Sequence, residues 1–211
     1  MLCSGTDSAT NTTCLTSSGI LVEDSQGNRY MTVASHGFPH DIRVYHPSPE
    51  HEEIGQVIME ITHTDVALVK LHDNIKFVNK TFEPELDGVA PIRFREYIPA
   101  NDTKLGDFVY MNNAFTGYSE GSCGAHSIMR IPSDDPNGPE LQWIKTRWMY
   151  LGQGFTDKLK DGVGRSVIWN TDGKVIGFFR YPPKSGHFLD WCCTVASDNA
   201  MEKGYKIVCT A

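Results

Sequence analysis

No stretch of the sequence approaches 18 consecutive apolar residues, so none of its 211 residues belongs to a segment expected to cross a membrane as a helix. The chain also lacks any basic run longer than two residues, and its net charge is −7. Because phosphate contacts need clustered Lys and Arg, we expect no nucleic-acid partner. Cys-x-x-Cys pairs are absent as well, which excludes the usual spacing of a structural zinc site.

The N-terminal residues 1–7 lack both a positively charged region and an apolar core, so no signal peptide is predicted. The compartment therefore stays open between the cytoplasm and a mature secreted form. Six cysteines permit disulfides without fixing their pairing. Cys3 and Cys14 are spaced to close a short loop, whereas alternation in a strand would send the adjacent Cys192 and Cys193 to opposite faces.

Short segments with the character of strands, separated by frequent turns, occupy most of the chain. The segments 19–23 and 29–34 flank a turn-rich stretch at 24–28, which predicts a β-hairpin. Turn signals at intervals of roughly 8–12 residues are typical of an all-β sandwich or barrel. Further strands are expected at 41–46, 54–62, 66–71, 108–112, 125–131, 140–148, 166–169 and 174–180.

Residues 72–105 are richer in proline and charge and lack a clear period, so we interpret them as the connection between two halves. We predict an N-terminal half at residues 1–90 and a C-terminal half at residues 91–211. A short helix is expected at 196–205, with Ser197 as its N-cap and a glycine near its end.

Two residues beside predicted strands are candidates for acid–base chemistry. His36 follows the strand 29–34, and Asp65 precedes the strand 66–71. A strand end at a cleft is a rigid place for a general base. Since the chain contains eight histidines, neither residue defines a site alone.

Three segments, taken in chain order, resemble trypsin-like serine proteases. Residues 32–37 (Thr-Val-Ala-Ser-His-Gly) are similar to the Thr-Ala-Ala-His element of that family. Residues 64–71 (Thr-Asp-Val-Ala-Leu-Val-Lys-Leu) are similar to its Asp-Ile-Ala-Leu-Leu-Lys-Leu element. Residues 162–178 resemble its Gly-x-Ser-Gly-Ser-Pro-Val-x-Asn-x-x-Gly-x-Val-Ile-Gly element, so the resemblance covers roughly residues 15–208.

The resemblance implies an all-β fold of two six-stranded antiparallel β-barrels of the chymotrypsin type, with a cleft between them and a short C-terminal helix. It makes His36 the general base and Asp65 the residue that orients it. The nucleophile of the family falls on Gly164, which has no side chain to attack a substrate. Arg165 replaces the small residue that follows the nucleophile in the family. The resemblance still implies an oxyanion pocket, with the backbone amides of Gly162 and Gly164 as its donors.

Two other residues are candidates for a displaced nucleophile. Ser166 lies two positions beyond Gly164, a spacing that shifts a strand side chain by about 6–7 Å. Cys123 stands in Gly-Ser-Cys-Gly, which matches an element of viral cysteine proteases with the same fold. However, 88 residues follow Cys123 and 47 follow Gly164, and only the second number suits one hairpin and a helix. We interpret 117–124 instead as the first hairpin of the second barrel.

Metal binding is the less favoured interpretation of two other clusters. His36, His40 and Asp41 would need a helical turn that Gly37 and Pro39 disfavour, and the acidic turn at 134–139 is interpreted as a solvated loop. We therefore predict no metal and no cofactor.

The sequence favours a catalytically inactive homologue of trypsin-like proteases that binds a protein or peptide. The alternative is an active serine or cysteine endopeptidase with a displaced nucleophile. Phe178, Phe179, Arg180 and Tyr181 would narrow the side-chain pocket of the family, so a retained groove should prefer a small or apolar contact. The oligomeric state is not determined by the sequence.

Overall fold

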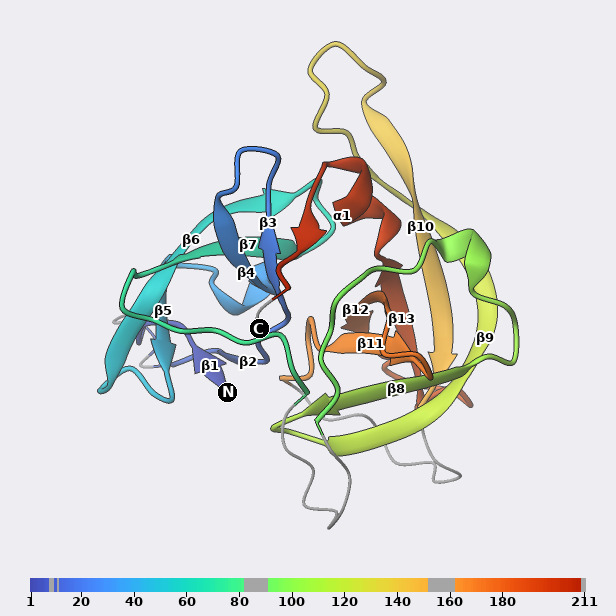
Figure 1. The fold of residues 1–211 in the computed structure, drawn as a ribbon, viewed down its shortest axis with the longest axis horizontal. Helices are drawn as coiled ribbons and strands as arrows, with labels where there is room; N and C mark the ends of the chain where they lie inside the picture. The colour runs from blue at the N-terminus through green and yellow to red at the C-terminus, as the bar shows by residue number, and fades with distance from the viewer. Residues whose placement is uncertain (8–9, 11, 82–90, 152–161, 210–211) are drawn as a thin grey trace.

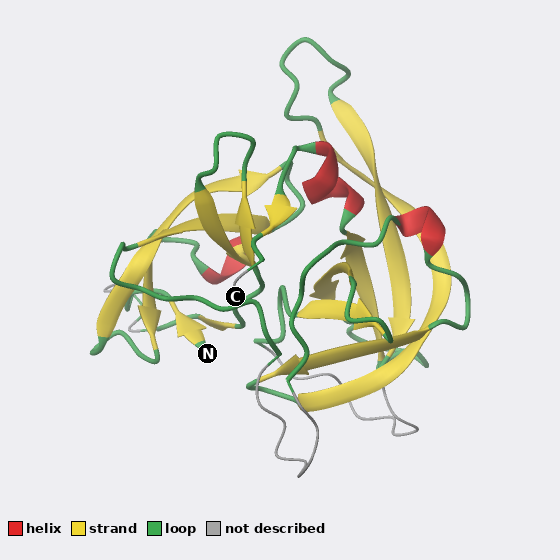
Figure 2. Cartoon of the chain, in the orientation of Figure 1, coloured by secondary structure: helices red, strands yellow, loops and turns green. Residues whose placement is uncertain are grey.

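The computed structural model describes residues 1–7, 10, 12–81, 91–151 and 162–209. Its strands form two sheets that lie side by side, with all pairings between the strands antiparallel (Figure 1). Little of the chain is helical (Figure 2). No helix in these ranges has the length and hydropathy that crossing a bilayer requires.

The first sheet has eight strands in the order β14-β3-β4-β7-β6-β5-β1-β2. The sheet thus has two strands more than the six predicted, and three of its strands contain only two residues each. The last strand of the chain, β14, pairs with β3 and so belongs to the sheet of the N-terminal strands. The bounds are β1 (Leu2–Cys3), β2 (Leu15–Thr16), β3 (Leu21–Glu23), β4 (Arg29–Ala34), β5 (Arg43–His46), β6 (Glu52–Ile61), β7 (Val66–Leu71) and β14 (Lys206–Ile207).

The second sheet is a closed six-stranded barrel in the order β10-β13-β12-β11-β8-β9. The expected hairpin at 117–124 is instead the first half of the long strand β9, which pairs with β8 across a turn at 114–116. The strand β13 was not predicted. The bounds are β8 (Phe108–Asn113), β9 (Gly117–Pro132), β10 (Leu141–Tyr150), β11 (Val167–Asn170), β12 (Val175–Tyr181) and β13 (Trp191–Ala196).

Local chemistry explains the predicted hairpin of β3 and β4. The Asp24 carboxylate accepts hydrogen bonds from the backbone amides of Gln26 and Asn28, both at 2.9 Å. Gly27 has a φ of 82°, which glycine adopts without steric cost. The turn therefore matches the prediction made from its composition.

The predicted C-terminal helix is present but shorter than expected. It is α1 (Asp198–Glu202), and two 3-10 turns, η1 (Ser35–Gly37) and η2 (Ala100–Asp102), complete the helical part of the described residues. Ser197 stands at the N-cap, but its hydroxyl donates to the carbonyl of Ile98 instead of capping. Past the end of α1, Gly204 has a φ of 83° and its amide donates to Met201, so glycine ends the helix as predicted.

Three clusters of buried apolar side chains match the two-lobed architecture. One fills the interior of the first sheet and includes Met31 and Val69, and a second fills the barrel and includes Met111 and Met149. The third lies between the two lobes, where Trp169 of β11 joins residues of β3, β7 and α1. Since burying one large apolar side chain is worth about 1.5–3 kcal/mol, the third cluster fixes the lobes against each other.

The predicted division between residues 90 and 91 stays a prediction, because residues 82–90 lie outside the described part of the chain. The strands themselves divide between residues 2–71 with 206–207 and residues 108–196. The described portion of residues 72–107 carries no named strand. The interpretation of residues 72–105 as the connection between two halves stays a prediction.

Candidate functional site

Pairing between β4 and β7 brings His36 and Asp65 together. Ala34, the last residue of β4, lies opposite Val66, the first residue of β7, so the residues just outside both strands become neighbours. His36 Nδ1 lies 2.7 Å from Asp65 Oδ2, and the His36 amide donates to Oδ1 at 2.8 Å. The carboxylate thus holds both the ring and the backbone of His36. Across a gap of 29 residues, the two candidates occupy one site.

The Asp65 carboxyl group lies in a mostly buried position, with 20% of its side chain exposed. Burial alone would raise its pKa, but the hydrogen bond from His36 and the positive charge of Arg165 outweigh burial and lower it. Asp65 is therefore the ionised partner of the pair. An ionised carboxylate at Nδ1 is the group that fixes the tautomer and orientation of a catalytic imidazole.

Gly164 faces the other side of the imidazole. A Cβ built on Gly164 would lie 3.1 Å from His36 Cε1 and 3.4 Å from His36 Nε2. Any side chain at this position would touch the ring directly. Within the described residues, His36 Nε2 has no hydrogen-bond partner. The place opposite the imidazole therefore holds no side-chain atom of residue 164.

Arg165, next to this gap, folds back beneath the His36–Asp65 pair. Its side chain is 0% exposed and donates to the Asp65 carboxylate oxygen that also contacts His36. Three backbone carbonyls accept from the same guanidinium: those of Thr64 at 2.8 Å, Asp65 at 2.7 Å and Phe179 at 2.9 Å. Burial lowers the pKa of Arg165 to about 10, opposed by the charge of Asp65. Arg165 therefore stays cationic at neutral pH and ties the loop to both lobes.

Two hydroxyl groups orient the loop from its other side. Thr16 donates to the carbonyl of Gly164 at 3.3 Å, and Ser17 donates to the carbonyl of Gly162 at 3.2 Å. Arg165 adopts a φ of 65° and Gly162 a φ of 89°, so the backbone reverses sharply at both residues. The loop is thus held by contacts with the first lobe on two sides.

Ser166 lies at the inner end of the loop and does not reach His36 with a hydrogen bond. The residue is 1% exposed, and its hydroxyl has no hydrogen-bond partner among the residues that the structure describes. Its amide donates to the carbonyl of Val163, and its carbonyl accepts from Phe179. The backbone of Ser166 is thus part of the structure of the turn, while its hydroxyl oxygen is unused.

Cys123 lies elsewhere, inside the second barrel. It is 1% exposed and packs in the cluster that contains Val109 and Met149. Burial raises the pKa of its thiol, which disfavours the reactive thiolate. All six cysteines have free thiols, including Cys3 and Cys14. Gly164, and not Cys123, is the residue that faces the imidazole.

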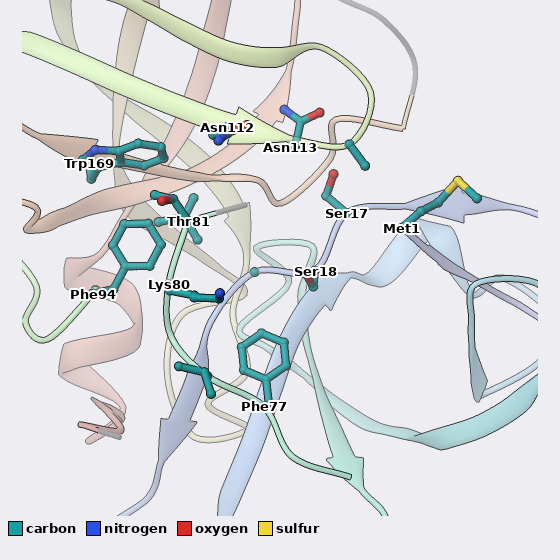
Figure 3. Close-up of a pocket in the computed structure, with 14 residues that line it drawn as sticks. Met1, Ser17, Ser18, Phe77, Lys80, Thr81, Phe94, Asn112, Asn113 and Trp169 are labelled. Carbon is teal, nitrogen blue, oxygen red and sulfur yellow. The ribbon is translucent and has the colours of Figure 1, made fainter. Parts of the chain in front are cut away.

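A cavity of about 410 Å³ lies at the junction of the two lobes, and its walls do not include His36, Asp65 or Gly164. Figure 3 shows the rings of Trp169, Phe94 and Phe77 along it, with Ser17 on the opposite wall. Ser17 lines the cavity and also donates a hydrogen bond to the carbonyl of Gly162. One residue therefore contacts both the cavity and the loop.

No group of three or more His, Cys, Asp or Glu side chains is arranged to hold a metal ion in the portion of the chain that the structure describes. The contact of the candidate site that sequence reasoning missed is that of Arg165 with Asp65. In the sequence, Arg165 is visible only as a bulky replacement for glycine. No local pattern indicates that its side chain reaches a residue 100 positions away.

Comparisons with known proteins agree with this architecture. No protein-family model and no curated protein matches the chain. Among solved structures, Thermobifida fusca protease A has a TM-score of 0.63 at 14% identity and covers 95% of this chain and 94% of its own. Cellulomonas bogoriensis chymotrypsin has a TM-score of 0.60 at 12% identity, with coverages of 92% and 90%. A glutamic-acid-specific serine protease has a TM-score of 0.61 at 13% identity, with coverages of 94% and 95%.

The chain therefore has the chymotrypsin-like double-β-barrel fold, and the predicted fold class is confirmed. The structures that share it are trypsin- or chymotrypsin-like serine proteases, as the resemblance of the three sequence segments implied. At identities of 12–14% the similarity establishes the fold and leaves the activity to be argued from the residues.

Proposed function

We propose that this chain is a catalytically inactive homologue of trypsin-like proteases that acts by binding a protein or peptide. The observation that carries the proposal is the geometry at Gly164, whose Cβ position lies 3.4 Å from His36 Nε2. Covalent catalysis in this fold requires an oxygen or sulfur atom within hydrogen-bond reach of the base. Among the described residues, no hydroxyl or thiol is hydrogen-bonded to that nitrogen.

The contact between Arg165 and Asp65 supports the same proposal. In a working triad the carboxylate stabilises the imidazolium that forms as the nucleophile loses its proton. Here the carboxylate oxygen nearest to His36 also accepts from a buried guanidinium. The carboxylate therefore serves a buried guanidinium as well as the ring, and the ring has no nucleophile opposite it.

The alternative is a working hydrolase with a displaced nucleophile, and the intact contact of 2.7 Å between His36 and Asp65 favours it. Ser166 is the nearest candidate along the chain. Its hydroxyl would have to leave a buried position, and the loop that holds Arg165 would have to rearrange. Because a misplacement of about 1 Å already impairs catalysis, this alternative needs a second conformation of the loop.

A fluorophosphonate probe, read by intact mass spectrometry, separates the two functions. We expect no adduct on the chain, because the probe needs an activated nucleophile. A stoichiometric adduct on Ser166 would show a working hydrolase. Labelling of Cys123 by a thiol-directed probe would show the same if substrate blocks that labelling. Unfolded protein serves as the control for nonspecific labelling.

Restoring the nucleophile tests the scaffold. Gly164→Ser together with Arg165→Gly should create detectable hydrolysis of an activated ester, whereas Gly164→Ser alone should give less because the guanidinium remains. The matched control is Gly164→Ala with Arg165→Gly, which shares the backbone change but carries no hydroxyl. Because both double variants lose the buried contacts of Arg165, circular dichroism first checks that they fold. If both fold and are equally silent, the cleft is remodelled beyond the missing side chain.

A further inference from the structure

The cavity of about 410 Å³ at the junction of the two lobes has an aromatic wall that the fold holds in place. Phe94 and Trp169 both belong to the apolar cluster that joins the lobes, and their ring centroids lie 5.2 Å apart. The amide of Phe94 donates to the carbonyl of Asn79 at 2.9 Å, which keeps its ring beside the next residue, Lys80. Figure 3 shows Lys80 between the rings of Phe94 and Phe77. Ligand pockets commonly enclose about 300–1,000 Å³ behind such apolar and aromatic walls, so the cavity has the size and lining of a binding site.

A second hollow, of about 600 Å³, adjoins this cavity beside the strands β4 and β7. Phe77 and Val78 line both spaces, so the cavity and the hollow share a wall. Leu71 and Ile75 add apolar surface to the hollow, and Val78 is exposed at the shared wall. An extended peptide advances about 3.3 Å per residue, so a segment of several residues can contact both spaces at once. The two spaces therefore suit a peptide chain better than a compact small molecule.

The charges that line the two spaces are mostly positive. Three lysines and one aspartate contribute to the lining, namely Lys70, Lys76, Lys80 and Asp73. Arg29 and His72 also line the hollow, but each lies beside a glutamate carboxylate, at 3.6 Å and 3.3 Å. Among the described residues, neither Lys70 nor Lys76 forms an ion pair. In a chain of net charge −7, this local excess of positive charge favours an acidic partner.

We propose that the cavity and the hollow together bind an acidic peptide segment of a partner protein, and that this segment carries one aromatic residue. The aromatic side chain enters the cavity and packs on Phe94 and Trp169, and the acidic side chains beside it lie near Lys70 and Lys76. Binding energy concentrates in buried aromatic anchors, whereas charges around them add specificity. The inference rests on the proposed function for the kind of ligand, a protein or peptide, and it places that ligand away from His36.

Three capped peptides test the proposal on the unmodified chain. The probe is Asp-Glu-Gly-Trp-Gly-Glu-Asp, which offers acids to the lysines in either chain direction. One matched peptide has serine in place of tryptophan, and the other has the amides Asn and Gln in place of the acids. By calorimetry, we expect loss of the ring to weaken binding about ten-fold, because the cavity stays unfilled. Loss of the acids should weaken binding about five-fold and remove its dependence on salt.

NMR spectra locate the bound peptide. In ¹⁵N spectra, the acidic aromatic peptide should shift the amide signals of Val78 and Trp169, since both residues line the cavity. Equal binding of all three peptides, binding of none, or shifts confined to residues outside the cavity and the hollow would overturn the proposal.

A single-stranded oligonucleotide is the competing ligand, because lysines and aromatic rings also bind phosphates and bases. We expect decathymidylate to bind more weakly than the acidic aromatic peptide, since the chain as a whole is acidic. If the oligonucleotide binds more tightly than the peptide and shifts the same signals, the assignment to a peptide is wrong.

Variants separate the ring contact from the charge contacts. Ala114 is an exposed residue of the cavity lining, so Ala114→Phe should fill the cavity and weaken binding of the tryptophan peptide about ten-fold, with no effect on the serine peptide. Lys70→Gln with Lys76→Gln should reduce the preference for acids about five-fold. The matched control is Lys104→Gln with Lys184→Gln, which removes two exposed lysines outside both spaces. Once thermal unfolding shows that the variants fold, unchanged preferences in Ala114→Phe or in the first lysine pair would contradict the proposed contacts.

The outcome is separable from the test for catalysis. A fluorophosphonate adduct on the unmodified chain would overturn the proposed inactivity, while the three peptides would still measure binding at the cavity. If neither an adduct nor peptide binding is found, only the assignment of the cavity and the hollow is wrong.

Discussion

Replacement of Arg165 by methionine removes one guanidinium from the centre of the site while it keeps much of the apolar volume. The group donates to three backbone carbonyls and to the Asp65 carboxylate, all from a side chain that is 0% exposed. We expect the variant to be strongly destabilised, because these acceptors lose their partner in a buried position.

The size of the effect follows from the contacts. Breaking a buried ion pair by removing one partner costs about 3–5 kcal/mol. Each buried acceptor left without a donor costs about 1–3 kcal/mol, but contributions within one network do not add in full. His36 still donates to Asp65, which limits the loss. We therefore expect the free energy of unfolding to fall by about 3–5 kcal/mol, or the Tm by about 6–20 °C.

Urea unfolding followed by tryptophan fluorescence measures this difference. Arg29→Met is the matched control, since Arg29 is an exposed arginine whose ion pair with Glu23 spans 3.6 Å. We expect it to change stability by less than about 1 kcal/mol. The backbone adds a second comparison: Arg165 has a φ of 65°, so Arg165→Gly should be about 1 kcal/mol more stable than Arg165→Ala. If Arg165→Met lies within about 1 kcal/mol of the unmodified chain, the four contacts do not hold the loop.

Three other predictions follow from single contacts. Burial raises the pKa of Asp65, but its hydrogen bond and its ion pair lower that pKa overall. The ionised carboxylate therefore stabilises the folded chain fully above the pKa of the unfolded state, about 3.9. This stabilisation is lost as the pH falls through the lower pKa of the folded state. The difference in urea stability between the unmodified chain and Asp65→Asn should therefore shrink in acid; a difference constant from pH 7 to pH 2 would contradict this. Cys209 is exposed, whereas burial raises the pKa of the Cys192 thiol to about 12. A thiol reagent should therefore modify Cys209 in the native protein and Cys192 only after unfolding. Peptide mass mapping measures which thiol is modified. Asp198→Ala removes a contact of 2.6 Å with Lys145 and should cost about 1–3 kcal/mol in thermal unfolding, and an unchanged Tm would refute it.

The sequence determined the class of fold and most of the strands. Alternation of apolar and polar residues is a local property, and the turn at 24–28 carries its own hydrogen-bonding chemistry, so the hairpin of β3 and β4 was predictable. The strand β13 was not, because Trp191–Ala196 is almost continuously buried and lacks a clear period. A two-residue strand such as β14 is too short to show any period.

The sequence also determined the identity of the candidate residues. His36, Asp65 and Gly164 stand in the order and context of the protease elements, and glycine has no side chain whatever the tertiary structure. That Asp65 and Gly164 lie on opposite sides of one imidazole follows only from the fold, because the pairing of β4 with β7 and the packing of the two lobes set those positions.

Only the tertiary structure decided the role of Arg165. A sequence pattern has no information about which of several distant partners a long side chain will reach, since that choice depends on where the two lobes meet. The partners of the Arg165 guanidinium come from both lobes. They are the Asp65 carboxylate and the Thr64 carbonyl from the first lobe, and the Phe179 carbonyl from the second. A charged side chain becomes stable in such a position only when the assembled fold supplies its partners, and for that reason no local rule predicted the contact.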